Sequence, residues 1–184
     1  MDRLAEASGV SRAMISKIER GESSPTAVLL GRLSAALELS VSELLTGARL
    51  GGGPVDGPGP GPEPPPPEAG GAGRVRRVAD APHWRDPDTG YLRRPISTPG
   101  FPAAVTEVML PPRTRVPYPA AAYAFIAQLV WVLSGQLTLT DGTERHVLEA
   151  GDTFELGQPR PREFGNETDA DCRYVVVVTR KSTA

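Results

Sequence analysis

The fold of the N-terminal third is decided by residues 8–26, which read SGVSRAMISKIERGESSPT. Ser11 stands directly before a run with helical spacing and is a typical N-cap, because its hydroxyl can accept a hydrogen bond from a backbone N–H of the first turn. Gly21 supplies the left-handed residue at which a helix ends. These two residues predict a helix over residues 12–20, and Thr26 is placed to cap the helix that follows.

Helix signals continue on both sides of this stretch. Leu4 and Ala5 lie on a helix that we expect to stop at residues 8–10, so that two helices meet in a short turn containing glycine. Downstream, Ser40 and Glu43 form an S-x-x-E capping box for a short last helix. Before that box runs one apolar helix face, made of Leu29, Leu33, Ala36 and Leu37.

Residues 4–45 resemble the phage-repressor-like (Cro/C1, XRE-type) helix-turn-helix family, and the string SKIERGESSPT is close to the usual wording of that family. The resemblance implies that the helix over residues 12–20 enters the major groove of double-stranded DNA with its N-terminal end. Ile15 and Ile18 are then expected to face the core with Val10. The expected DNA-binding residues are the outward ones: Ser11, Arg12, Ala13, Ser16, Lys17 and Arg20.

The chemistry of these side chains suits DNA. Arg12 can bind a guanine edge through two hydrogen bonds, and Lys17 can reach a base or a phosphate. Ser11 and Arg20 are expected to contact phosphates, which position the helix without reading sequence. Residues 11–20 carry three basic and one acidic side chain, a local charge of +2. The alternative is that these charges only solvate a helix face, which is the better interpretation of an isolated helix but not of the whole motif.

The DNA-binding unit of this family normally begins with a helix ahead of the one that carries Leu4, and Met1 falls at the start of this second element. We therefore expect the first helix to be missing. Its apolar face would cover Leu4 and the helix of residues 29–37, so a large stabilising contribution would be lost. Two explanations stay open: a start codon placed too late, which we favour, and a genuinely incomplete head.

Residues 51–73 separate two halves of different pattern. Nine Gly and eight Pro fill this stretch, so it cannot bury enough apolar surface to offset the entropy of ordering it. We predict a disordered linker here, between a head of residues 1–50 and a second domain of residues 74–184. Runs rich in Val, Leu, Thr and aromatic residues predict strands in the second domain. They are Ala104–Leu110, Phe125–Leu133, Gln136–Thr140, Arg145–Leu148, Thr153–Leu156 and Tyr174–Thr179.

Two stretches of the second domain carry a further resemblance. Residues 128–142, QLVWVLSGQLTLTDG, and residues 148–166, LEAGDTFELGQPRPREFGN, resemble the two conserved stretches of the cupin superfamily of small jelly-roll barrels. Behind a helix-turn-helix, such a barrel resembles a group of regulators with a C-terminal cupin sensor. The predicted fold is therefore a two-domain α + β chain, with a small all-α helix-turn-helix head and an all-β cupin-like jelly-roll barrel.

Many cupins bind a metal through two His and a Glu in the first stretch and a His in the second. Gln128 stands where the family has its Glu, and Arg162 stands where it has its last His. The other two ligands would lie within residues 120–124, but no His occurs between His83 and His146. A divalent metal needs several imidazole or carboxylate ligands that converge. We therefore expect no metal, no cofactor and no catalytic residue.

The resemblance implies a cavity inside the barrel. Alternation along the strand puts Gln128, Val130 and Val132 on the face that lines it. Arg162 is expected to reach the same cavity, with Tyr123 near the mouth. Because a buried Arg needs a carboxylate or phosphate partner, a small anionic effector is one candidate, and an internal acid such as Glu163 or Glu155 is its equal rival.

The opposite face of the same strand carries Leu129, Trp131 and Leu133. Trp131 and Leu133 can pack under the incoming segment of residues 84–96 or at a dimer interface. We favour core packing over the dimer interface. The contact that forms a dimer can therefore come from either domain.

Composition excludes several classes of protein. The net charge of −2 argues against a polybasic nucleic-acid binder, so any DNA contact depends on local charge. Cys172 is the single cysteine, which excludes a disulfide-stapled secreted fold, and its acidic surroundings predict an inert thiol. The sequence has neither a run of about eighteen apolar residues nor the features of a signal peptide, so we expect a cytoplasmic protein without a membrane span.

These patterns predict a sequence-specific transcriptional regulator that binds a double-stranded operator as a homodimer. The barrel would sense an effector or mediate dimerisation. One alternative is a metal-dependent cupin enzyme with a degenerate head. Another is an interaction protein that does not bind DNA, if the first helix is truly missing.

Overall fold

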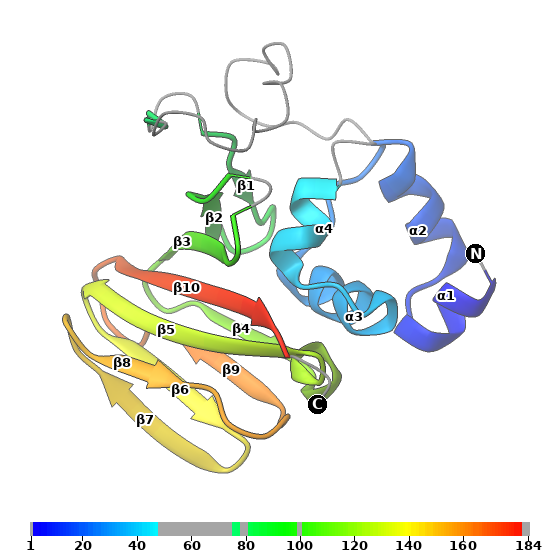
Figure 1. Cartoon of the computed structure of the whole chain (residues 1–184). Helices are drawn as coiled ribbons and strands as arrows, with labels where there is room; N and C mark the ends of the chain where they lie inside the picture. Colours follow the sequence, from blue (N-terminus) through cyan, green and yellow to red (C-terminus); the bar gives the residue numbers. More distant parts are fainter. Residues whose placement is uncertain (1, 48–74, 78–80, 99–100, 182–184) are drawn as a thin grey trace.

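The computed structural model describes residues 2–47, 75–77, 81–98 and 101–181. The head consists of four helices, α1 (Asp2–Ser8), α2 (Arg12–Glu19), α3 (Ala27–Leu37) and α4 (Val41–Gly47). A β domain follows, and α3 and α4 lie between it and α1 and α2 (Figure 1). The predicted linker of residues 51–73 lies outside the described residues.

The helix ends predicted from the sequence are confirmed. The Ser11 Oγ accepts a hydrogen bond from the N–H of Met14 at 3.2 Å, and the Thr26 Oγ1 caps α3 in the same way. Ser40 and Glu43 bind each other reciprocally, since each side chain accepts the backbone N–H of the other. These contacts satisfy N–H groups that a helix start leaves without a partner. The boundaries of the head are therefore set by local chemistry.

The head encloses a small core of its own. Val10, Ile15 and Leu33 are buried in it, and Ile18 and Leu4 pack against them as half-buried residues. This is the arrangement expected from the sequence for Val10, Ile15 and Ile18. Because Ile15 faces this core, the opposite face of α2 points outward.

The β domain consists of two antiparallel sheets. The six-stranded sheet has the order β1-β2-β3-β10-β5-β8, and the four-stranded sheet has the order β4-β9-β6-β7. A 3-10 helix, η3 (Ala120–Tyr123), connects β4 and β5. The bounds are β1 (Trp84–Arg85), β2 (Leu92–Pro95), β3 (Ala104–Leu110), β4 (Arg115–Tyr118), β5 (Ile126–Ser134), β6 (Leu137–Asp141), β7 (Glu144–Leu148), β8 (Thr153–Glu155), β9 (Arg162–Gly165) and β10 (Cys172–Arg180). Since the described strands of the two sheets do not pair with each other, the jelly roll is two-layered and not one closed ladder.

Six of these strands correspond to the predicted ones, and β1, β2, β4 and β9 do not. The last three of these read LRRP, RVPY and REFG. Each has four residues, and each contains Arg, Pro or Gly, so none has the run of β-branched residues by which strands are recognised. Their pairing partners hold them in place: β2 pairs with β3, and β9 pairs with both β4 and β6.

The strand alternation predicted for β5 is confirmed. The side chains of Val130 and Val132 are fully buried between the sheets, whereas the side chain of Trp131 faces outward. Core packing of Trp131 was the wrong prediction, because this residue is 46% exposed. The segment expected to cover it pairs with β3 instead, and β10 separates β3 from β5 in the sheet.

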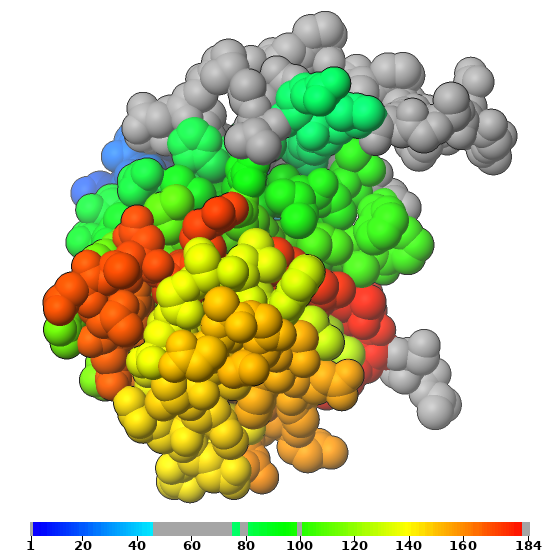
Figure 2. Space-filling model, turned by 90° about the vertical axis from the view of Figure 1, so that its left-hand side faces the viewer, coloured from blue at the N-terminus to red at the C-terminus, as the bar shows by residue number. Residues whose placement is uncertain are grey.

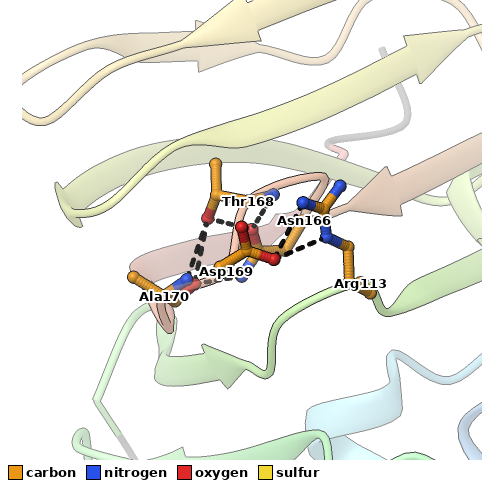
Figure 3. Close-up of polar contacts among 5 residues, drawn as sticks. All are labelled: Arg113, Asn166, Thr168, Asp169 and Ala170. Atoms are coloured by element: carbon orange, nitrogen blue, oxygen red, sulfur yellow. Dashed lines mark hydrogen bonds and ion pairs between the residues drawn. The ribbon is translucent and has the colours of Figure 1, made fainter.

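Asn166 ties the loop before β10 to the rest of the domain (Figure 3). Its side-chain amide donates a hydrogen bond to the carbonyl of Leu110 at the end of β3, and its Oδ1 accepts from the N–H of Thr168. Beside it, Arg113 and Asp169 form an exposed ion pair of 2.8 Å. Because Asn166 is 1% exposed and its amide is well hydrogen-bonded, this last residue of the second cupin-like stretch has a structural role.

The head is docked directly on the β domain. Helix α3 contacts η3 and β4, and α4 contacts β3. The Ser42 and Thr106 hydroxyls lie 2.9 Å apart, and Glu43 forms an ion pair with Arg180 at 2.9 Å. Figure 2, drawn from the side opposite the head, shows a surface formed by the β domain with only an edge of the head behind it.

Close approach of α3 depends on a glycine. A Cβ added to Gly31 would lie 2.6 Å from Cδ1 of Tyr118, which is far below an ordinary contact. Near it, the carboxylate of Asp86 accepts the first N–H of α3, from Ala27. The interface is therefore built from a shape match and from polar contacts that link residues far apart in the sequence.

Candidate nucleic-acid interface and barrel-mouth cavity

Helix α2 presents the side chains predicted to meet DNA. Its N-terminal end and one complete side are open to solvent, because only Ile15 is buried on it. Of the six predicted DNA-binding residues, Ser16 is half-buried, and the exposed ones are Ser11, Arg12, Ala13, Lys17 and Arg20. The structure thus brings all six together on one helix and its two caps, Ser11 and Arg20.

Two of these basic residues have exposed acidic neighbours. Arg12 pairs with Asp2 at 2.8 Å, and the two side chains are 67% and 69% exposed. Arg20 pairs with Glu22 at 2.6 Å, and this hydrogen bond lowers the pKa of Glu22 and raises that of Arg20. Exposed pairs of this kind are weak, so a phosphate can take the place of the carboxylate. Sequence reasoning missed both pairs, although Glu22 is only two residues from Arg20.

The basic side of α2 is not covered by the β domain. The elements that dock are α3 and α4, while α1 and α2 lie on the far side of the head (Figure 1). The N-terminal end of α2 is therefore accessible to a partner while the head remains docked.

A cavity lies where the head meets the mouth of the barrel. Its volume is about 30 Å³, which is room for roughly one water molecule. The head contributes Ser34, Ser40, Val41 and Ser42 to its wall. The polar part of the β-domain wall consists of Tyr91, Arg93, Tyr118, Tyr123, Gln128 and Tyr174. Two residues predicted for an effector site, Tyr123 and Gln128, are among them.

Arg162, the third predicted effector residue, has a partner within the protein. It is 2% exposed, and its Nε lies 2.9 Å from the Oδ1 of Asp141. This is an ion-pair distance, although the angle at Nε is not that of a hydrogen bond. Its Nη2 donates to the carbonyl of Gln158, and its guanidinium lies 4.5 Å from the ring centre of Tyr123. Arg162 does not line the cavity, and an internal acid compensates its charge, as in the rival interpretation.

Arg93 is the arginine that does line the cavity. It is 6% exposed, and its Nη1 and Nη2 donate to the Tyr91 hydroxyl at 2.8 Å and to the Ser42 hydroxyl at 3.2 Å. Its Nε has no hydrogen-bond partner, and none of its described neighbours is a carboxylate at ion-pair distance. Alternation along β2 turns Arg93 inward and its neighbour Arg94 outward to Glu107. Recognition of β2 as a strand would have revealed this difference.

The cavity is rich in hydrogen-bond donors. Burial raises the pKa of Tyr118, of Tyr123 and of Tyr174 above the ordinary value of 10, so these phenols keep their protons. Burial by itself lowers the pKa of Arg93, but the surrounding phenol oxygens, with that of Tyr91 foremost, raise it on balance. The guanidinium therefore stays charged, and the wall offers donors to an acceptor.

The positions that bind metal in cupins do not suit a metal here. Gln128 offers an amide and Arg162 a cation, and the residues of η3 are alanines and Tyr123. Among the residues that the structure describes, His, Cys, Asp and Glu form no group of three suited to a metal ion. Burial raises the pKa of the Cys172 thiol to about 12, so this buried residue is not a thiolate ligand at neutral pH.

Comparison with known proteins identifies both parts of the chain. The Helix-turn-helix (HTH_3) family matches residues 1–44, and the Cupin domain family matches residues 107–178. Over 46 residues the chain is 46% identical to the HTH-type transcriptional regulator SutR of Escherichia coli (strain K12), a match over 25% of this chain and 26% of SutR. The chain thus spans about a quarter of the length of this relative.

Two solved structures match larger parts of the chain. An HTH_3 family transcriptional regulator from Vibrio cholerae has a TM-score of 0.68 at 19% identity, over 98% of this chain and 86% of that one. The cupin domain of an XRE family transcriptional regulator from Enterobacter cloacae has a TM-score of 0.46 at 14% identity, over 50% of this chain and 98% of that one.

At these identities the Vibrio likeness establishes the shared fold, in which a helical head precedes a β domain. None of the described helices is long and apolar enough to cross a membrane. Residues 1–44 belong to the Helix-turn-helix (HTH_3) family and residues 107–178 to the Cupin domain family, so the chain joins a helix-turn-helix head to a C-terminal cupin domain.

Proposed function

We propose that this protein is a sequence-specific transcriptional regulator in which α2 reads an operator and the cupin domain senses a small molecule. The observation that carries the proposal is the exposed basic side of α2, on a head whose other side is docked. SutR and the Vibrio protein are both described as transcriptional regulators, which supports the same interpretation. In this proposal Arg12 and Lys17 contact bases, and Ser11, Ala13, Ser16 and Arg20 complete the contact surface.

DNA binding is tested by fluorescence anisotropy with a duplex from the region upstream of the protein's own gene. The double variant Arg12→Ala/Lys17→Ala should bind this duplex about 100-fold more weakly, because each side chain contributes about 1–3 kcal/mol. Arg32→Ala is the matched control, since Arg32 is an exposed arginine of the head that is not on α2. Equal losses in the test variant and the control would contradict the role of α2.

The same assay separates a regulator from an interaction protein that does not bind DNA. Binding is measured with the chain as given and with a version extended upstream at its N-terminus. Specific binding by either version supports the regulator. If neither version prefers the upstream duplex over a scrambled one, the interaction protein is the better assignment.

We propose a homodimer, since helix-turn-helix proteins of this kind bind two half-sites about one helical turn apart. The outer face of the six-stranded sheet is one candidate surface, because the exposed Trp131 there lies beside Val175 of the neighbouring strand. Trp131→Glu should shift the protein from dimer to monomer in analytical ultracentrifugation. A matched control is Val147→Glu, at an exposed apolar residue of the other sheet.

The cupin domain is proposed to sense a small anionic effector. Tyr123 and Gln128 line the cavity, and the guanidinium of Arg162, compensated by Asp141, lies over the ring of Tyr123. The alternative is a metal-dependent cupin enzyme, against which the residues at the metal-binding positions of cupins, Gln128 and Arg162, stand. Metal analysis of the purified protein decides between the two, since stoichiometric iron, manganese or zinc would favour the enzyme.

A further inference from the structure

The cavity at the barrel mouth is shared between the two domains. Ser42 of α4 lines it together with four tyrosines of the β domain. Without the head, Arg93 would lose the Ser42 hydroxyl that now accepts its Nη2–H. The same guanidinium thus belongs to the domain interface and to the cavity.

The charge inside the cavity is not balanced. Asp141 compensates Arg162, but the described partners of Arg93 are hydroxyl groups only. A buried cation without an anion is costly, and its orphaned Nε adds the cost of an unmade hydrogen bond. One negative charge would cancel the surplus, and a dianion would exceed it.

The wall around Arg93 suits a carboxylate with an apolar body. Phenols of Tyr118 and Tyr174 can donate to the second carboxylate oxygen, in addition to the guanidinium. Beyond them the wall is apolar, with Ile126, Val176 and Val178. Such a pocket pairs one polar anchor with an apolar surface, as small-molecule sites do.

The docked head leaves no room for such a ligand. The cavity of about 30 Å³ holds a water molecule, whereas a carboxylate needs the place of the Ser42 hydroxyl and more. Binding therefore requires α4 to withdraw from the mouth. The contacts that would be given up include the hydrogen bonds of Ser42 with Arg93 and Thr106, of Ala27 with Asp86, the ion pair of Glu43 with Arg180, and the packing of α3 at Gly31.

We propose that Arg93 anchors the carboxylate of a small monoanionic effector, and that this effector and the docked head compete for the barrel mouth. The proposal rests on the proposed function and names the anchor and the coupling of its sensor site. Because coupling is reciprocal, an effector that binds better to the undocked form also releases the head, by the same factor. The head is then free to change its position relative to a second head on DNA.

The site is tested by calorimetric titration of the full chain with sodium acetate and sodium benzoate. Acetamide and benzamide are the neutral controls. We expect the carboxylates to bind and the amides not to bind, and Arg93→Gln to weaken binding about tenfold or more. Arg93→Lys keeps the charge but loses the planar donors, so it should lie between the two, and circular dichroism shows that each variant is folded. Unchanged affinity in folded Arg93→Gln, or the absence of binding by either carboxylate, would overturn the anchor.

The competition is tested by locking and by loosening the head. The Ser42→Cys/Thr106→Cys variant should form a disulfide across the interface, because the two hydroxyls are 2.9 Å apart. Oxidised, it should lose carboxylate binding, and reduction should restore it. Arg180→Glu, which repels Glu43, should strengthen binding severalfold, whereas Arg145→Glu, at an ion pair with Glu167 in the other sheet, should not.

Equal carboxylate binding by the locked and reduced forms would refute the competition while leaving the anchor intact. Neither result depends on DNA. A protein that binds its operator but no carboxylate would therefore contradict this inference and keep the proposed regulator, and the reverse result would contradict only the regulator.

Discussion

The arginines that lie on the two sides of the head have different kinds of partner. On the α2 side, Arg12 and Asp2 form a pair that water surrounds. On the docked side, α4 lies against Arg93 of β2, which is buried and whose partners among the described residues are hydroxyl groups. An exposed pair is easily exchanged for another partner, whereas a buried cation retains a demand for an anion. The exposed Arg12 can thus exchange Asp2 for another anion, whereas the buried Arg93 still lacks an anion.

The largest change in stability should come from breaking the buried ion pair between Arg162 and Asp141. Asp141→Asn leaves the charge of Arg162 buried and uncompensated, and should lower the free energy of unfolding by about 3–5 kcal/mol. Urea denaturation followed by circular dichroism measures this change. Asp169→Asn removes an exposed partner of Arg113 and should change stability by at most about 0.5 kcal/mol. If the two variants were equally stable, burial would not be what separates the two kinds of pair.

A smaller effect is expected where the docked side depends on shape. Gly31→Val places branched carbon atoms against the buried ring of Tyr118 and should cost about 1–3 kcal/mol, through strain or through loss of docking. Hydrogen exchange of the β4 amides should then increase if the head undocks. Val28→Ala, at an exposed residue of the same helix, is the control. Unchanged exchange together with unchanged stability would show that the head does not need this close contact.

The smallest effect concerns the exposed pair on α2. Asp2→Asn should leave stability nearly unchanged, because such pairs contribute roughly 0–1 kcal/mol. It should increase DNA affinity by at most about fivefold, since Arg12 no longer exchanges a carboxylate for DNA. Anisotropy titrations at two salt concentrations measure this. A loss of affinity would mean that Asp2 orients Arg12 for binding.

Sequence predicted the head better than the mouth of the barrel. Capping at Ser11, Thr26 and Ser40 depends on residues within a single turn, so local patterns suffice. The docking contacts join residues that are far apart in the chain, such as Ala27 with Asp86 and Glu43 with Arg180. Spacing within a strand or helix carries no information about such pairs.

In the candidate site, too, local patterns were predictable from the sequence and long-range contacts were not. The inward direction of Gln128 was predictable from strand alternation, because β5 is long and apolar. The arginine that lines the cavity is Arg93 and not Arg162, and the sequence did not show this, since β2 is too short and too polar to be recognised as a strand. Which arginine has an acid beside it depends on the arrangement of three strands, and that is a property of the assembled sheets.

The buried position of Cys172 has a practical consequence. Its thiol is buried, and its pKa of about 12 keeps it protonated. Thiol reagents should therefore not react with it at neutral pH. The protein is thus a ready background for cysteine labelling without removal of a native residue. Cysteines introduced at exposed sites on α2 and β7 could carry spin labels or dyes that measure the distance between the head and the barrel. Cys172 would not be labelled and would add no signal of its own.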